Sequence, residues 1–134
     1  MTNRTWRIVF GAINAGCAFL LIQTDAPLEG WDNLDIKQGR AVYPLDMLDA
    51  SVDEIRASHV LEHFPRAQAM AVLREWVRVL KPGGLLRVAV PDFGVIAEAY
   101  VAGEALDTEG YVMGGQVDRH DFHHALYDRA QHAL

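Results

Sequence analysis

A predicted helix followed at once by an apolar strand, in the middle of the chain, limits the fold more than any other feature of the sequence. Apolar side chains recur at three- and four-residue steps from Arg66 to Leu80, which predicts a helix with one buried face. Lys81 to Gly84, KPGG, is expected to end this helix. Leu85 to Val90, LLRVAV, is apolar on both faces except at Arg87, which is typical of a strand in a parallel sheet covered on two sides by helices.

Similar signals along the rest of the chain predict four more strands and two more helices. The strands are expected at Ile8 to Ile13, around Trp31 to Ile36, at Ala41 to Tyr43 and from Asp53 to His59. The helices are expected from Phe93 to about Ala102 and from Asp121 to Leu134, with a loop-rich stretch at Gly103 to Gln116 between them. This alternation predicts one α/β domain over residues 1–134, a Rossmann-like three-layer sandwich around a mostly parallel five-stranded sheet.

The composition is that of a folded, single-domain protein. The chain has 134 residues, enough for one hydrophobic core but too few for a catalytic domain with a separate substrate domain. Its formal net charge is -6 and no run of Lys and Arg lies among aromatic residues, which argues against nucleic acid as a partner. Cys17 is the single cysteine, so an intramolecular disulfide and a cysteine-rich zinc site are excluded, and this fits a cytoplasmic location.

The N-terminal segment has a second interpretation, as the signal of an exported lipoprotein. Arg4 and Arg7 precede an apolar run from Ile8 to Ile22 that contains Cys17. The run is too short to cross a bilayer comfortably. Asn14 stands three positions before Cys17, where a lipoprotein signal usually has a branched aliphatic residue. We therefore expect a strand of the sheet here and no membrane association, with export as an alternative.

Side chains that follow the predicted strands are candidates for a ligand site, because ligands of parallel α/β sheets bind beyond the carboxyl ends of the strands. A nucleoside ligand needs a glycine turn and, about twenty residues later, an acid for its ribose hydroxyls. Gly16 and Asp35 have this spacing, and Asp46 follows the next predicted strand. The strand-end candidates are Gly16, Asp35, Asp46, Ser58, His59 and Asp92.

Several longer motifs surround these strand ends. The most specific is LREWVRVLKPGGLLRVAVPD, Leu73 to Asp92, and GGQVDRHDFHH, Gly114 to His124, is another. The remaining segments are the turn at Ile13 to Ala18, Asp35, SVDEI at Ser51 to Ile55, and SHVLEHF at Ser58 to Phe64. In these motifs the sequence resembles the class I S-adenosylmethionine-dependent methyltransferases, particularly the type 11 group.

This resemblance implies S-adenosylmethionine as the cofactor and assigns roles to the strand ends. Gly16 would approach the methionine part of the cofactor, Asp35 the ribose hydroxyls and Asp46 the adenine amine. Ser58 and His59 would line the floor near the sulfonium. The cofactor-binding residues implied in this way are Asn14, Gly16, Asp35, Asp46, Met47, Ser58 and His59.

Methyl transfer needs a general base only if the acceptor must lose a proton. His59 is then the first candidate, with Asp92 and His123 behind it. Structural interpretations stand beside these roles. His59 and His63 could bond the strand-to-helix turn, Glu62 could be a partner for backbone amides, and Asp92 could cap the following helix.

The histidines of HDFHH raise the question of a metal site. On a helix, His120 and His124 share one face while His123 lies aside, and no further ligand set is apparent upstream. We therefore expect no metal, and interpret these histidines as a solvated face or part of an acceptor pocket.

Two departures from the family pattern affect the expected architecture. Ala18 stands where the family has its third glycine, and the chain stops before the family's sixth and seventh strands. The fifth strand would then be an exposed edge, covered by the last helix or by a second subunit in a homodimer.

The expected function is that of a small cytoplasmic S-adenosylmethionine-dependent methyltransferase with a small-molecule methyl acceptor. A non-catalytic module of the same fold, which binds the cofactor or a partner, is the alternative that Ala18 and the missing strands favour. The exported lipoprotein is the third.

Overall fold

A parallel sheet forms the centre of the protein in a computed structural model that describes residues 7–10, 32–34 and 41–129. Its strands are β1 (Arg7–Phe10), β2 (Asp32–Leu34), β3 (Val52–Ser58) and β4 (Leu80–Ala89). The helical elements are the 3-10 turn η3 (Leu61–His63) and the helices α1 (Arg66–Val79), α2 (Phe93–Val101) and α3 (Thr108–Met113). The α/β class and the parallel sheet predicted from the sequence are confirmed.

The four strands of the described ranges lie in the order β2-β1-β3-β4, and every neighbouring pair is parallel. Phe10, the last residue of β1, is level with Leu34 of β2 and with Ala57 of β3. The carboxyl ends of these strands therefore meet at one edge. The chain passes from β1 to β2 on one side and then to β3 on the other, so the topological switch point lies between β1 and β3.

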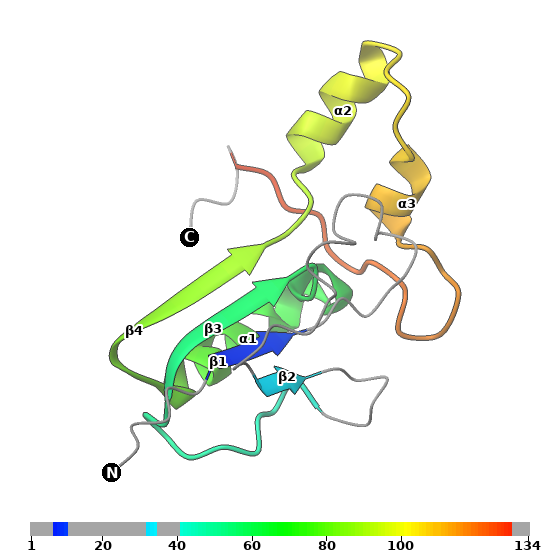
Figure 1. Ribbon diagram of the computed structural model, residues 1–134. Coiled ribbons are helices and arrows are strands. Elements are labelled where there is room, and N and C mark those ends of the chain that lie inside the picture. The colour runs from blue at the N-terminus through cyan, green and yellow to red at the C-terminus, as the bar shows by residue number, and fades with distance from the viewer. Residues whose placement is uncertain (1–6, 11–31, 35–40, 130–134) are drawn as a thin grey trace.

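Helix α1 packs on one face of the sheet and supplies much of the core (Figure 1). Its apolar stripe brings Val72, Trp76 and Val79 to full burial. Ile55 and Ala57 meet them from β3, because alternate side chains of a strand point to the same face. Burial of such side chains is worth about 1.5–3 kcal/mol each, so this contact between helix and strand stabilises the edge at which β3 ends.

The opposite face of β3 and β4 is polar in the described ranges. Arg56 and Arg87 lie side by side in register, and Nε of Arg87 is 3.0 Å from Oε1 of Glu54. These side chains line an open hollow of about 630 Å³. Among the described residues a helix packs on one face of the sheet, and the three-layer arrangement stays a prediction.

The third of the expected strands, at Ala41 to Tyr43, is not formed, and this prediction was wrong. The backbone near it bonds to side chains of α1 and not to a strand: Nε1 of Trp76 donates to the carbonyl of Val42 at 2.9 Å, and the amide of Leu45 donates to Glu75 at 2.9 Å. Residues 42–49 therefore form an irregular segment that crosses α1, which we call the strap.

Two boundaries differ from the sequence prediction around β4. The helix ends at Val79, and KPGG belongs to β4, because Leu80 already pairs with Val52 of β3. The register is irregular between Val52 and Glu54: these residues pair with Leu80 and Leu85, so Lys81 to Gly84 lie between the two paired positions of β4. β4 is the outer strand of the described sheet, while its coverage by a second subunit stays a prediction.

The C-terminal part differs most. A short helix, α3, forms in the stretch expected to be loop, where the carboxylate of Asp107 accepts from the amide of Gly110 at 3.0 Å and caps it. The helix expected from Asp121 is absent from residues 121–129. The amides of His123, His124 and Ala125 donate to carbonyls of distant segments, and that of His124 donates to the backbone carbonyl of Glu62 at 2.7 Å. This segment, orange to red in Figure 1, runs back past the ends of β3 and β4.

Candidate functional site

His59 is the first residue after β3 and stands beside the switch point of the sheet. Its amide donates to the carbonyl of Ala89 at 2.8 Å, which continues the pairing of β3 with β4 by one residue. Its φ of 55° is in the left-handed region, which costs a residue other than glycine about 1–3 kcal/mol and is concentrated at functional sites. Ser58 and His59 are both 8% exposed, as expected for the floor of a site.

Glu62 lies next to His59, one turn further along the chain. Oε1 of Glu62 is 3.2 Å from Nδ1 of His59, within ion-pair distance but without the alignment of a hydrogen bond. The Glu62 side chain is 1% exposed, and neither carboxylate oxygen has a hydrogen-bond partner. The interpretation of Glu62 as a partner for backbone amides was wrong for its side chain, although its backbone carbonyl accepts from the amides of His124 and Ala125. A buried carboxylate without donors is costly, which makes Glu62 a candidate for a functional role.

His63 and His123 complete a cluster with Glu62. Their rings meet edge to face with centroids 4.7 Å apart. His63 contacts the C-terminal segment through its Nδ1, which is 3.0 Å from the carbonyl oxygen of His120. Nδ1 of His123 is 2.9 Å from the carbonyl oxygen of Tyr111. Since a carbonyl only accepts, each Nδ1 carries a proton in this arrangement.

Burial also sets the charge of His63. Desolvation lowers the pKa of His63 below its usual 6.5, and the nearby Glu62 carboxylate opposes this only in part. The neutral imidazole is therefore favoured near neutral pH. Asp121, which is fully buried, adds a further negative charge close to the cluster.

The GGQVDRHDFHH motif forms the turn that brings His123 to the cluster. Gly114 has a φ of 81°, and a Cβ at this position would collide with the carbonyl oxygen of Asp121. The carboxylate of Asp121 accepts from the amide of Val117 at 3.0 Å, and the amide of His123 donates to Met113 at 3.0 Å. Sequence reasoning missed Asp121 and the pairing of His63 with His123, since both depend on a return of the chain from a distant segment.

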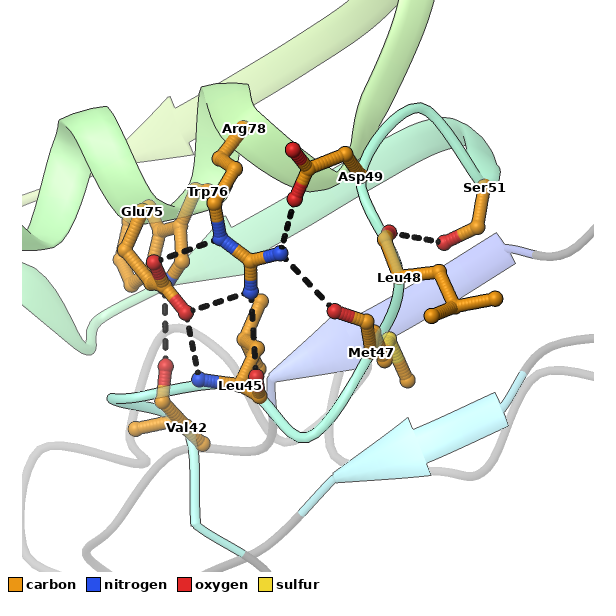
Figure 2. Close-up of polar contacts among 9 residues, drawn as sticks. All are labelled: Val42, Leu45, Met47, Leu48, Asp49, Ser51, Glu75, Trp76 and Arg78. Carbon is orange, nitrogen blue, oxygen red and sulfur yellow. Dashed lines mark hydrogen bonds and ion pairs between the residues drawn. The ribbon is translucent and has the colours of Figure 1, made fainter.

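Asp46 and Met47 lie in the strap across α1. Arg78 holds this strap in place (Figure 2). The guanidinium donates to the carbonyl of Met47 at 2.9 Å and to the carboxylate of Asp49 at 2.6 Å. It also donates twice to Glu75, at 2.9 and 2.8 Å, and this pair lowers the pKa of Glu75 to about 2. Asp46 is exposed on this anchored segment, so its carboxylate is available to a ligand.

Asp92 begins α2 and caps it. Its Oδ1 accepts from the amides of Gly94 at 3.0 Å and Val95 at 3.4 Å, so the capping interpretation is confirmed. A pocket of about 330 Å³ opens beside Asp92, lined also by Pro91 and Tyr127. Burial raises the pKa of Tyr127. A role of Asp92 in catalysis stays a prediction.

The structure brings some predicted site residues together and leaves others outside its range. Ser58 and His59 share the end of β3, and His123 reaches the same region through Glu62. Asn14, Gly16 and Asp35 lie outside the described residues. Asp35 directly follows Leu34, with which β2 ends at the same edge.

The described part of this edge fits a nucleoside-bearing cofactor. Parallel strands end together at a switch point, which is where such ligands bind in open α/β sheets. The exposed carboxylate of Asp46 is a suitable acceptor for an amine, and the pocket beside β4 is within the size range of ligand sites.

Comparison with known proteins gives one match. The family described as methyltransferase domain matches residues 19–88, which is more than half of the chain and includes β2, β3, α1 and most of β4. Comparison with curated proteins and with solved structures gives no significant match. No helix of the described ranges combines the length and the apolar character needed to cross a membrane. The family match, together with the parallel sheet, shows that the chain belongs to the class I S-adenosylmethionine-dependent methyltransferases.

Proposed function

We propose that this protein is an enzyme that transfers a methyl group from S-adenosylmethionine to a small-molecule acceptor. The observation that carries the proposal is the place of His59 at the switch point of the sheet, inside the segment that matches the methyltransferase family. A small acceptor is favoured because the net charge of -6 disfavours nucleic acid. The proposed location is the cytoplasm, which the single cysteine, Cys17, fits.

The cofactor would be held by residues at the strand ends. Asp35 would accept from the ribose hydroxyls, Asp46 from the adenine amine, and Gly16 would let the methionine part approach the backbone. Asn14, Met47 and Ser58 complete the predicted set. When bound, S-adenosylmethionine supplies an electrophilic methyl group on a positively charged sulfur.

His59 would accept the proton that a hydroxyl or amine acceptor loses. Its Nδ1 faces Glu62, so its Nε2 is the ring nitrogen available to the acceptor. The carboxylate of Glu62 would stabilise the imidazolium that forms, as the carboxylate of a catalytic dyad does. Its low exposure keeps the pair away from water, which strengthens this interaction. Most of the acceleration would come from alignment of the acceptor with the methyl group.

Two measurements test the proposal in sequence. Isothermal titration with S-adenosylmethionine and with S-adenosylhomocysteine should show one site for each. A methyl-radiolabelled cofactor incubated with pooled metabolites should then label an acceptor. Binding without transfer to any acceptor would favour the non-catalytic module, and no binding of either compound would refute the proposal. A native chain that begins at Met1 or Thr2 by mass spectrometry would exclude the lipoprotein.

A further inference from the structure

We propose that Glu62, His63 and His123 form a binding site for a zinc ion. One carboxylate oxygen and one ring nitrogen from each histidine lie within 4.8 Å of one another. Two histidines and one glutamate are a ligand set that Zn²⁺ uses in proteins, with a fourth position open to water. The site joins the η3 turn to the C-terminal segment, and nothing in the match to the methyltransferase family requires it.

The candidate ligand atoms of the three residues are slightly further apart than they would be around a bound zinc ion. Ligands about 2.0–2.1 Å from a tetrahedral zinc ion are roughly 3.3 Å apart. The ligand atoms, at up to 4.8 Å from one another, would therefore have to approach one another by about 1.5 Å at most. The edge-to-face contact between the His63 and His123 rings already sets the two imidazoles at an angle to each other.

The hydrogen bonds of the two histidines prepare them as ligands. Metal-binding histidines usually donate their second ring N–H to a carbonyl or carboxylate, which fixes the tautomer and the ring orientation. His63 and His123 both do this, toward the carbonyls of His120 and Tyr111. With Nδ1 of His63 directed at a carbonyl, Nε2 is the ring nitrogen that would bind the cation.

Glu62 supplies the second, independent observation. Its carboxylate is 1% exposed and both oxygens lack a hydrogen-bond partner, an arrangement that a bound cation would satisfy. Asp121, also fully buried, has one oxygen without a partner and adds negative charge nearby. The groups that could neutralise Glu62 instead are His59, at 3.2 Å, and His63. Neither makes a hydrogen bond to it.

The binding test uses metal content and does not depend on methyl transfer. The full chain is stripped with a chelator, titrated with Zn²⁺ against a chromophoric competitor, and its bound metal is measured by mass spectrometry. We expect one equivalent of zinc and a rise in the melting temperature. His123→Asn and Glu62→Gln should each weaken binding by about 100-fold or more, since even second-shell losses cost about 10–100-fold.

His124→Asn is the matched control, because His124 neighbours His123 but is exposed. It should bind zinc as the parent chain does. X-ray absorption of the zinc-loaded parent chain should show imidazole and oxygen ligands only, and this readout remains even if a variant does not fold. Failure of the parent chain to bind stoichiometric zinc, sulfur in the zinc shell, or equal losses in His124→Asn and His123→Asn would each overturn the site. The proposed methyl transfer would be untouched by these outcomes, since cofactor titration tests it separately.

Discussion

Nδ1 of His59 lies 3.2 Å from Oε1 of Glu62, so the residue that directly follows β3 and a residue of the η3 turn form one buried pair. The pair combines a strained backbone, at a φ of 55°, with a carboxylate that has no hydrogen-bond donor. Both features cost folding free energy, which is typical of a site kept for function.

Replacement of His59 should lower turnover more than cofactor affinity. His59→Asn is a better variant than His59→Ala, because asparagine tolerates positive φ and alanine is strained there. Loss of a general base lowers kcat by about 10²–10⁴-fold. The measurement is kcat for methyl transfer beside Kd for S-adenosylmethionine by calorimetry. Equal losses in both would point to a binding or structural role.

Asp35→Ala should abolish binding of the cofactor. The carboxylate is predicted to accept two hydrogen bonds from the ribose, and charged hydrogen bonds are worth about 1.5–3 kcal/mol each, so Kd should rise about 100-fold or more. Titration with S-adenosylhomocysteine measures this without turnover. Glu98→Ala, which removes an exposed carboxylate from α2, is the control and should bind normally. Unchanged affinity in Asp35→Ala would refute the ribose assignment.

Glu75 should make stability depend on pH in acid. Its hydrogen bonds from Arg78 and Leu45 lower its pKa from 4.5 to about 2 in the folded protein. A lowered folded pKa stabilises above the unfolded pKa, and this contribution is lost as the pH falls through the folded value. The difference in unfolding free energy between the parent chain and Glu75→Gln should therefore be constant above pH 4.5 and shrink toward pH 2.

Urea unfolding at several pH values measures the effect of Glu75. Glu98→Gln, at an exposed position of α2, should follow the parent chain at every pH. A difference for Glu75→Gln that stays constant from pH 4.5 down to pH 2 would contradict the role of the Arg78 contact.

Gly114→Ala and Gly103→Ala should differ although both glycines have positive φ, 81° and 72°. At Gly103 an added Cβ meets nothing within 4 Å, so the cost is the backbone strain of about 1–2 kcal/mol. At Gly114 the Cβ would also collide with the backbone of Asp121. Thermal unfolding should show the larger loss for Gly114→Ala. Similar losses would mean that the turn adjusts, and that it does not hold His123 rigidly.

Trp76→Phe should destabilise the protein by about 1–3 kcal/mol, because the buried carbonyl of Val42 loses the N–H that it accepts at 2.9 Å. Urea unfolding checks this value. Val77→Ala, on the exposed side of the same helix, should change stability by no more than about 0.5 kcal/mol. An equally small change for Trp76→Phe would show that the strap from Val42 to Asp49 does not depend on this bond.

The elements that the sequence predicted best are those with regular periodicity. α1 begins at Arg66 and ends at Val79, one residue from the expected boundary, and α2 starts at Phe93 as predicted. The strand-end positions of Ser58 and His59 also followed from the pattern alone. The strand expected at Ala41 to Tyr43 failed, because its short apolar run serves as a strap whose backbone bonds to Trp76 and Glu75.

The histidine cluster shows the limit of such reasoning. Helical spacing placed His120 and His124 on one face and left His123 aside. In the structure the segment is not helical, and His123 is the residue that meets His63. Glu62 is part of the SHVLEHF motif, so the sequence already drew attention to it. Only the structure shows that its carboxylate is buried without a hydrogen-bond partner, which an ordinary turn residue would not be.

By itself, the sequence determined the α/β class, the parallel strands, the family and the strand ends where a cofactor is expected, because these depend on local periodicity and on motifs within one stretch of chain. Only the tertiary structure decided that Glu62, His63 and His123 meet and that Arg78 holds the segment bearing Asp46. Those contacts join segments far apart in the chain, and backbone groups of each segment find partners that no local pattern can specify.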